Sequence, residues 1–263
     1  VEDLRRCITS IEKKSTWKNY EIVVVENNSV EQSIRDYYKE LERDPKVKIV
    51  TYEGGFNYSR INNVGVKETK GEYLLFLNND TEVISPDWME QLLMYAQRKD
   101  VGAVGAKLYY ADNTIQHAGV VIGLGAHRSA GHTHYKMPRE HLGYMGRLCY
   151  AQDVTAVTGA CLMVKKSIYE EVDGLDESFT ISLNDVDLCL KIREKGYLNI
   201  FTPFAELYHY ESKTRGMEEG EKLRRYEREC AHFRDKWKEQ LDAGDPYYNP
   251  NFSLDYSDFT LRF

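Results

Sequence analysis

The chain has 263 residues, of which 29% are charged and 42% hydrophobic, and its formal net charge is −7. This length supports one large α/β domain or one domain with an appended lobe, and the acidic balance argues against a general nucleic-acid-binding protein. The five cysteines are scattered without a C-x-x-C pair, so we predict reduced thiols and neither a disulfide framework nor a zinc site.

The first fifty residues alternate between helical and strand patterns. Apolar residues recur at helical spacing from Leu4 to Ile11 and from Ile34 to Leu41. Runs rich in Val and Ile at 20–25 and 47–52 predict two strands. Strands joined by a helix in this β-α-β order predict a parallel sheet with right-handed crossovers.

A glycine pair at 54–55 precedes a predicted helix that carries Asn62, Asn63 and Gly65. The first turn of a helix has free backbone N–H groups that can bind an anionic ligand. A plain turn followed by a helix cap is the alternative for the glycine pair.

The most informative stretch is 71–83, where five apolar or aromatic residues lead directly into Asn78, Asn79 and Asp80. A run this short and this apolar is typical of a strand that is buried on both faces. Ligands of open α/β sheets bind beyond the carboxyl ends of such strands. The stretch therefore predicts that Asp80 lies at the ligand-binding edge of the sheet. The alternative is a turn rich in Asn and Asp without a functional role.

The middle of the chain begins with Ser85 and Pro86, a good helix start, and a helix to about 98. Strands are expected at 101–110 and 114–123. Residues 124–151 show neither a helical nor a strand period, which predicts a long mobile loop facing a substrate. A metal at His132 and His134 is a weak alternative because no further ligand motif accompanies them.

A second group of motifs follows a predicted strand at 154–164, which Gly159 interrupts, and a short helix at 166–172. A helix from about 184 to 195 carries Asp185 and Asp187 in its first turn, where the helix dipole favours a carboxylate. The alternative is that Asp185 and Asp187 are ordinary acidic residues at a helix start without a functional role. Strands at 198–202 and 206–210 then lead to His209, which read alone is a core histidine.

The last fifty residues predict a helix at 217–241 followed by a Tyr- and Asn-rich tail that docks in extended form. The polar face of the helix mixes both charges, which favours a solvated face over a membrane patch. We therefore divide the chain into a catalytic domain at 1–212 and a C-terminal helix and tail at 213–263 that pack on it.

Together these motifs resemble the family 2 glycosyltransferases. They are the strand ending at Asp80, the Gly-x-Asp-Glu-x-Phe sequence at 174–179, the Asp-x-Asp-Leu helix at 185–191 and His209. The sequences at 56–63 and 245–251 look most like rhamnosyltransferase-like enzymes of bacterial surface-polysaccharide clusters. The resemblance covers about residues 2–240 and implies a GT-A fold, a Rossmann-like, mixed, mainly parallel sheet flanked by helices. The family's usual first strand is missing ahead of Leu4, so we expect the chain to be a fragment.

The resemblance also implies a role for each matching residue. Asp185 would be the catalytic base, and Asp80 and His209 would hold Mn2+ or Mg2+. The nucleotide would contact Glu26, Asn63, Gly65, Asn78 and Asn79, and its diphosphate would contact Lys213 and Arg215, which could equally belong to a solvated loop. The acceptor region would include Gly159, Asp176, Asn184 and Asp187.

The activity implied is an inverting transfer of a sugar from a UDP- or dTDP-linked donor to a glycan or lipid-linked glycan, in the cytoplasm. A lipid-linked acceptor would bring the protein to the inner membrane face, although no apolar run is long enough to span a bilayer. Asn78 and Asn184 stand where the family commonly has acids. A catalytically weakened or non-catalytic relative that binds nucleotide sugar or glycan is therefore the alternative. A nucleotidyltransferase and a polymerising synthase are less favoured because their motifs are missing.

Overall fold

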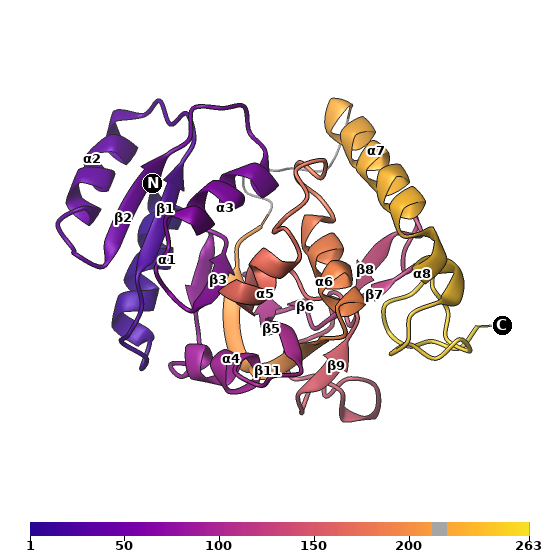
Figure 1. The fold of residues 1–263 in the computed structure, drawn as a ribbon. Coiled ribbons are helices and arrows are strands. Elements are labelled where there is room, and N and C mark those ends of the chain that lie inside the picture. Colours follow the sequence, from indigo (N-terminus) through magenta and orange to yellow (C-terminus); the bar gives the residue numbers. More distant parts are fainter. Residues whose placement is uncertain (212–219, 263) are drawn as a thin grey trace.

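The computed structural model describes residues 1–211 and 220–262 (Figure 1). The α-helices are α1 Glu2–Lys14, α2 Gln32–Leu41, α3 Tyr58–Lys67, α4 Trp88–Ala96, α5 Lys166–Glu171, α6 Asn184–Glu194, α7 Glu221–Lys236 and α8 Lys238–Ala243. The strands are β1 Ile22–Glu26, β2 Val47–Thr51, β3 Tyr73–Leu77, β4 Thr81–Val83, β5 Val101–Tyr109, β6 Ile115–His117, β7 Val120–Ile122, β8 Ala130–His132, β9 Gln152–Val154, β10 Cys161–Lys165 and β11 Leu198–His209.

A seven-stranded mixed sheet forms the centre, with the order β3-β10-β5-β11-β4, β6 beside β5 and β9 beside β11. β5 and β11 run parallel, whereas β10 runs antiparallel to both β3 and β5. The chain enters β10 from a turn at 158–160, where the N–H of Asn78 donates to the carbonyl of Ala160 at 3.0 Å. Because the chain enters β10 at the carboxyl end of β3, β10 runs in the opposite direction to β3.

β1 and β2 form a separate parallel pair, in register from Ile22 with Val47 to Glu26 with Thr51. α2 connects them, as the β-α-β pattern predicts, and Figure 1 shows this unit at one side of the central sheet. The predicted parallel pairing is thus confirmed here and for β5 with β11.

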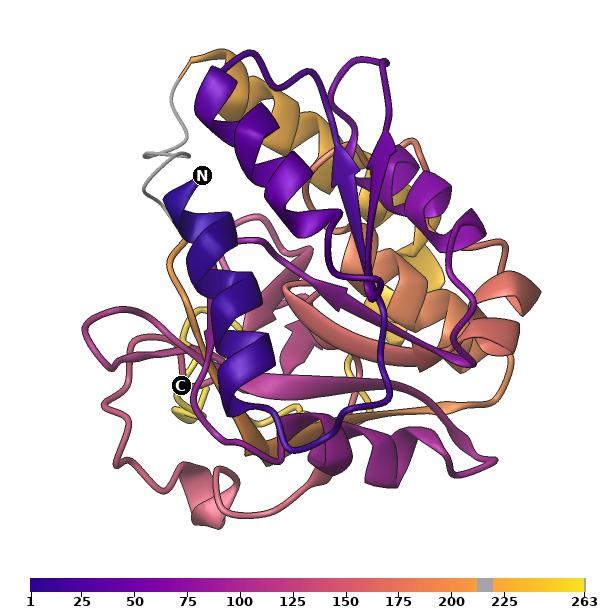
Figure 2. The same cartoon turned by 90° about the vertical axis from the view of Figure 1, so that its left-hand side faces the viewer.

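Helices cover both faces of the central sheet, and the alternating side chains of β10 show how. Leu162 and Val164 belong to the core cluster that includes α3, α5 and α6, and Cys161 and Met163 belong to the cluster that includes α1 and α4. Adjacent residues of a strand point to opposite faces, so β10 is buried from both sides. Figure 2 shows α1 crossing one of these faces, against β4.

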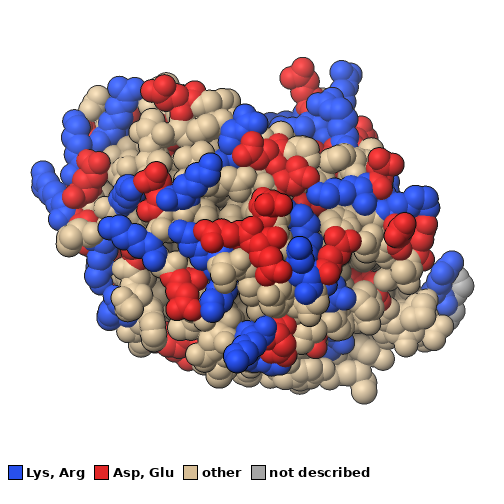
Figure 3. Space-filling view, in the orientation of Figure 1, with Lys and Arg blue, Asp and Glu red and all other residues tan. Residues whose placement is uncertain are grey.

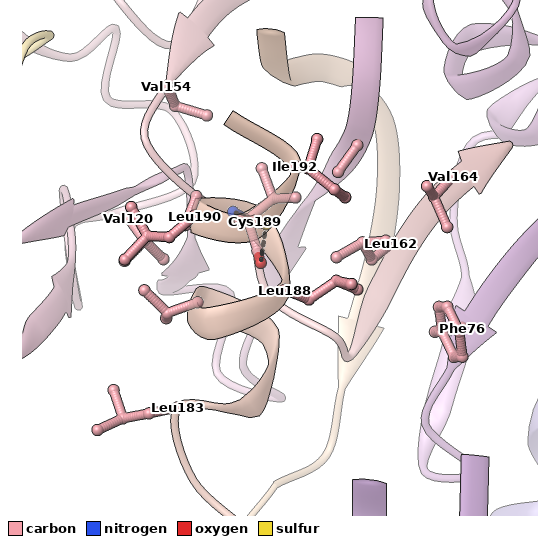
Figure 4. Packing of buried hydrophobic residues seen from close by; sticks show 14 of the residues in the cluster. Phe76, Val120, Val154, Leu162, Val164, Leu183, Leu188, Cys189, Leu190 and Ile192 are labelled. Carbon is pink, nitrogen blue, oxygen red and sulfur yellow. Dashed lines mark hydrogen bonds between the residues drawn. The ribbon is translucent and has the colours of Figure 1, made fainter. Parts of the chain in front are cut away.

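α6 is the helix that carries the second group of motifs, and its apolar side chains hold it on the sheet. Figure 4 shows Leu188 directed toward Leu162 of β10 and Leu190 toward Val120 of β7. Cys230 and Phe233 of α7, together with Trp237, join the same cluster. The C-terminal helix is therefore part of the main core, while the tail adds a small cluster of Tyr248, Phe252 and Phe259 over β7.

Several predicted elements differ in detail. The strand expected at 114–123 divides into β6 and β7 because Gly119 turns the chain with a φ of +99°. The strand expected at 154–164 divides into β9 and β10, which pair with different neighbours. Residues 198–209 form one irregular strand, β11, where two were expected.

The segment at 124–151 is more ordered than predicted. It contains β8, which pairs with β7, and a 3₁₀ turn, η1 Tyr144–Gly146. Ser129, Thr133 and His134 are buried within it. The sequence hid this hairpin because three-residue strands are too short to show a period.

Two helix ends also differ from the prediction. Asp87, and not Ser85, precedes α4, since the Ser85 hydroxyl accepts a hydrogen bond from the N–H of Glu206 at 2.7 Å. The predicted C-terminal helix breaks at Trp237 into α7 and α8, and its expected start at 217 lies outside the described residues. Among the described residues no helix is both long and apolar enough to cross a membrane.

Candidate active site

The carboxyl end of β3 delivers Asp80 to the edge of the sheet. After β3 the chain makes a turn in which the carbonyl of Asn78 accepts from the N–H of Thr81 at 3.3 Å and from its hydroxyl at 2.9 Å. β4 then pairs with β11 so that Thr81 lies opposite His209. This register brings Asp80 Oδ1 to 3.2 Å from His209 Nε2.

The imidazole of His209 has its protons fixed by its neighbours. Gln116 Nε2 donates to Glu211 Oε2 at 3.0 Å, so Gln116 Oε1 faces His209 Nδ1 at 2.6 Å and must accept from it. Nδ1 therefore carries the proton and Nε2 presents its lone pair. Asn78 Nδ2 lies 3.1 Å from His209 Nε2.

Two acceptors consequently face each other, His209 Nε2 and the carboxylate of Asp80. Asn78 Nδ2 also points at His209 Nε2, and a cation between the two acceptors, either a proton or a metal ion, would be stabilised by both of them. A metal-bound imidazole typically donates its other N–H to an oxygen that fixes its orientation, which is what Gln116 provides. This pair therefore fits a divalent cation such as Mn2+, which accepts both carboxylate and imidazole ligands.

The set of protein ligands is small. Among residues 1–211 and 220–262 no group of three or more His, Cys, Asp and Glu side chains is placed to hold a metal. A cation at Asp80 and His209 would need further oxygen ligands from a substrate, and a diphosphate supplies such oxygens.

Asp185 lies at the start of α6, held by the 158–160 turn. Its Oδ2 accepts from the N–H of Gly159 at 2.8 Å, and its Oδ1 accepts from the N–H of Val186 at 2.8 Å. A Cβ at position 159 would lie 3.3 Å from Asp185 Cβ and 3.3 Å from the hydroxyl of Tyr58. Close approach of the turn to Asp185 thus depends on a glycine.

The same turn connects Asp185 to Asp80 and His209. The Tyr58 hydroxyl lies 3.2 Å from the carbonyl of Gly159 and 3.4 Å from Asn78 Oδ1. Asn78 contacts His209 in turn. The structure therefore brings together Asp80, Asn78, His209, Gly159 and Asp185, all of which we predicted as site residues.

The predicted nucleotide residues of α3 serve the fold. Asn63 Oδ1 accepts from the N–H of Leu175 at 3.1 Å, and its Nδ2 donates to the carbonyl of Leu175 at 2.9 Å. A Cβ at Gly65 would lie 2.7 Å from Val25, so that glycine allows α3 to pack on β1. The side-chain amide of Asn63 is therefore used within the protein, and Gly65 has a packing role.

The remaining predicted nucleotide and diphosphate residues are distributed as follows. Glu26 ends β1, and its carboxylate accepts from the N–H of Ser29. Asn79 is exposed in the turn beside Asp80. Lys213 and Arg215 lie outside the described residues.

Three of the predicted acceptor residues are engaged in packing. Lys236 Nζ lies 2.7 Å from Asp176 Oδ2 and 2.6 Å from Asp187 Oδ1, and Trp237 Nε1 also donates to Asp187 at 2.9 Å. Asp187 is fully buried, so these contacts clamp the end of α7 onto α6. Asn184 is buried too, and its Nδ2 donates to the carbonyl of Ile181 at 3.0 Å.

The electrostatics of Asp176 follow from this clamp. Partial burial opposes its ionisation, but hydrogen bonds from Lys236 and Ser178 outweigh burial and hold the pKa of Asp176 well below its usual value. A carboxylate engaged in this way has little capacity left for a substrate hydroxyl.

α7 also supports the loop that leads into α6. The buried carboxylate of Glu229 accepts from the N–H groups of Thr180, Ile181 and Ser182 at 2.8, 3.1 and 2.9 Å. Leu183 follows with a φ of +63° and precedes the first turn of α6, which contains Asp185. The C-terminal helix therefore fixes the backbone in front of Asp185.

Four further residues line the proposed site or support it, namely Tyr58, Gln116, His117 and His132, and none of them was among the predicted site residues. Gln116 and His117 lay within a predicted strand, and His132 lay in the segment read as a loop. The aromatic and amide residues around 56–63 were a signal for Tyr58, but no local pattern marked the others.

A mixed sheet with an acid and an imidazole at its edge, and a second carboxylate beside them, has the architecture of a GT-A glycosyltransferase. The family model described as Glycosyl transferase family 2 matches residues 1–173, more than half of the chain. The chain belongs to this family, and the predictions of fold and family are confirmed.

Two relatives align with almost all of the chain. It is 47% identical over 261 residues to the uncharacterized protein y4gI of Sinorhizobium fredii, covering 98% of this chain and 28% of that protein. It is 35% identical over 265 residues to the O-antigen biosynthesis protein RfbC of Myxococcus xanthus, covering 98% of this chain and 20% of RfbC. The chain thus spans less than a third of the length of either relative.

A solved structure shows the same fold at low sequence identity. The crystal structure of GalNAc-T7 with UDP, GalNAc and Mn2+ matches with a TM-score of 0.69 and 16% identity, over 91% of this chain and 46% of that one. At this identity the similarity concerns the fold alone.

Proposed function

We propose that the chain transfers a sugar from a nucleoside-diphosphate sugar to a hydroxyl of a glycan acceptor, with inversion, in the synthesis of a bacterial surface polysaccharide. The observation that carries this proposal is the facing pair of Asp80 and His209, 3.2 Å apart, linked to Asp185 through the 158–160 turn. The similarity to an O-antigen biosynthesis protein supports the class of product.

Asp80 and His209 would hold the divalent cation, Mn2+ or Mg2+. When bound, the cation supplies Lewis-acid stabilisation of the negative charge that develops on the departing diphosphate. His209 is held ready for this role because Gln116 and Glu211 fix its tautomer. Asn78 lies beside the imidazole and offers only a neutral amide.

Asp185 would accept the proton of the attacking hydroxyl. The N–H groups of Gly159 and Val186 orient its carboxylate, and a carboxylate positioned in this way typically contributes roughly 10²- to 10⁴-fold to the rate. Asp185 acts in this proposal as the base and no protein side chain takes part as a nucleophile, so the reaction is a single displacement, which inverts the anomeric configuration. Such an enzyme would act in the cytoplasm, at the inner membrane face if its acceptor is lipid-linked.

The donor site can be tested by calorimetric titration with UDP and dTDP, with and without Mn2+. We expect binding that depends on Mn2+ and weakens at least roughly tenfold in Asp80→Ala, since even supporting residues of metal sites have effects of that size. Asp87→Ala, an exposed acid next to α4, is the matched control. Equal, metal-independent binding by the wild type and Asp80→Ala would contradict the proposal.

A further inference from the structure

His117 and His132 form a second polar cluster, apart from Asp80 and His209. β6 ends at His117, and β8 ends at His132, which lies opposite Val120 in the β7–β8 hairpin. Their Nδ1 atoms are 2.9 Å apart and the rings meet edge to face, with centroids 5.0 Å apart. His117 is fully buried and His132 is partly exposed.

The hydrogen bonds fix where each ring carries its proton. The N–H of Thr158 points at His117 Nε2 from 3.5 Å, so Nε2 is the acceptor and Nδ1 holds the proton. His117 Nδ1 then donates to His132 Nδ1, which leaves the proton of His132 on Nε2. Burial lowers the pKa of both histidines, that of His117 well below its usual value, so the pair stays neutral.

The histidine pair is connected both to His209 and to the turn that holds Asp185. Gln116, adjacent to His117, bonds to His209, while Thr158, which bonds to His117, precedes the Gly159 that bonds to Asp185. His132 is close enough to Asp185, Glu211 and His209 for each to influence its pKa.

The Nε2–H group of His132 is free for a ligand. Within the described residues it has no hydrogen-bond partner, and it is not one of the side-chain atoms that are both buried and unpaired. It is therefore a donor of fixed orientation that solvent, or a ligand that replaces solvent, can reach.

We propose that His132 binds substrate, donating from Nε2 to a sugar hydroxyl oxygen of a substrate bound at the proposed site, and that His117 positions it. This inference rests on the proposed function and adds a specificity-determining residue to it. A neutral imidazole that has only a proton to donate cannot accept the proton of the attacking hydroxyl, so the two side chains have different tasks.

The first arm of the test observes the pair directly. In two-bond 1H–15N spectra of histidine-labelled protein, His132 should show a protonated Nε2 and an unprotonated Nδ1, assigned with His132→Gln. UDP- or dTDP-sugar plus Mn2+, or methyl glycosides, should shift the Nε2 resonance of His132. The opposite tautomer, or no shift with any of these probes, would overturn the proposal.

The second arm compares the KM values of His132→Leu with those of His132→Gln, whose amide keeps a donor near the position of Nε2. His141→Leu, which changes an exposed histidine of the same segment, is the control. We expect His132→Leu to raise the KM of one substrate about three- to tenfold, as for loss of one neutral hydrogen bond. Its melting temperature should be unchanged. The KM of His132→Gln should lie closer to that of the wild type. A change in the acceptor KM assigns the hydroxyl to the acceptor, and a change in the donor KM assigns it to the donor sugar. Unchanged KM values, or equal effects of both variants, would overturn the proposal.

The positioning role of His117 is tested by rescue. His117→Leu should raise the same KM as His132→Leu, and His117→Asn, which keeps a donor toward His132, should restore most of the loss. Metal-dependent UDP binding should persist in all these variants, since they leave Asp80 and His209 intact. Failure of the proposed function would instead appear as absent binding in the wild type.

Discussion

Asn78 is the residue at which this site departs from an all-acid metal motif. Its amide lies 3.1 Å from His209 Nε2 and 3.4 Å from the Tyr58 hydroxyl, so it bridges the proposed metal ligands and the 158–160 turn. A neutral amide avoids placing a second carboxylate beside Asp80 when no cation is bound. The same choice would remove one charged oxygen ligand from the proposed cation.

We expect Asn78→Asp to bind Mn2+ roughly tenfold more tightly, because affinity for hard cations rises with the number of charged ligands. Without metal, the added carboxylate beside Asp80 should lower the melting temperature through like-charge repulsion. Titration of Mn2+ in the presence of UDP measures the first effect and thermal unfolding the second. Asn19→Asp, which adds the same charge at an exposed position, should change neither.

Gly159 is the second decisive residue, since both Asp185 and Tyr58 lie against it. An added methyl would sit 3.3 Å from each, so one of them must move by a few tenths of an ångström. We expect Gly159→Ala to lower kcat by on the order of tenfold, because small displacements of a base are costly. UDP binding should be retained.

Gly55→Ala is the control for this change, because no atom lies within 4 Å of the added group. Steady-state kinetics and calorimetry on both variants separate chemistry from binding. Full activity in Gly159→Ala would show that the turn does not position Asp185.

Among the elements, α7 connects the C-terminal part of the chain to the site. Glu229 holds the 180–182 loop in front of α6, and Lys236 and Trp237 hold Asp176 and Asp187 at the other end of α7. A helix whose sequence shows a solvated, mixed-charge face therefore also fixes the backbone around Asp185.

The clamp predicts a pH-dependent stability. Because the pKa of Asp176 is lowered in the folded protein, its ion pair stabilises the fold above the unfolded pKa near about 3.9, and this stability is lost as the pH falls through the folded pKa. Asp176→Asn should thus lower the free energy of unfolding by about 1 kcal/mol at pH 7, and the difference should shrink below about pH 4.

Urea unfolding of the wild type and Asp176→Asn between pH 7 and pH 3 measures this difference. Asp242→Asn serves as control because its pair with Lys238 is exposed and should contribute little. A difference that is independent of pH would exclude the ion pair as its cause.

At the scale of the whole molecule, the two faces of the central sheet are closed by helices from opposite ends of the chain. α1 contributes Cys7 and Ile11 to one core cluster, while α7 contributes Cys230 and Phe233 to the other. On the face drawn in Figure 3, acidic and basic side chains are interspersed without a continuous basic field. This distribution agrees with the net charge of −7.

The sequence alone determined the α/β class and the family, and it predicted Asp80, Asp185 and His209 as site residues. Asp80, Asp185 and His209 were predicted from the order and spacing of several motifs and the family resemblance that these carry, since each motif alone also has a purely structural interpretation. The ends of β6 to β9 were not predictable, because strands of three residues carry no period and their pairing depends on distant segments.

Only the tertiary structure decided which polar groups are available for a ligand. Asn63, Asp176 and Asp187 look like binding residues in the sequence, yet their hydrogen bonds are used within the fold. Gln116 and His117 carry no local signal and His132 only a weak one, yet the tertiary structure brings Gln116 into contact with His209 and His117 into contact with His132. Burial and hydrogen-bond partners set the availability of a side chain, and both arise from contacts between residues far apart in the chain.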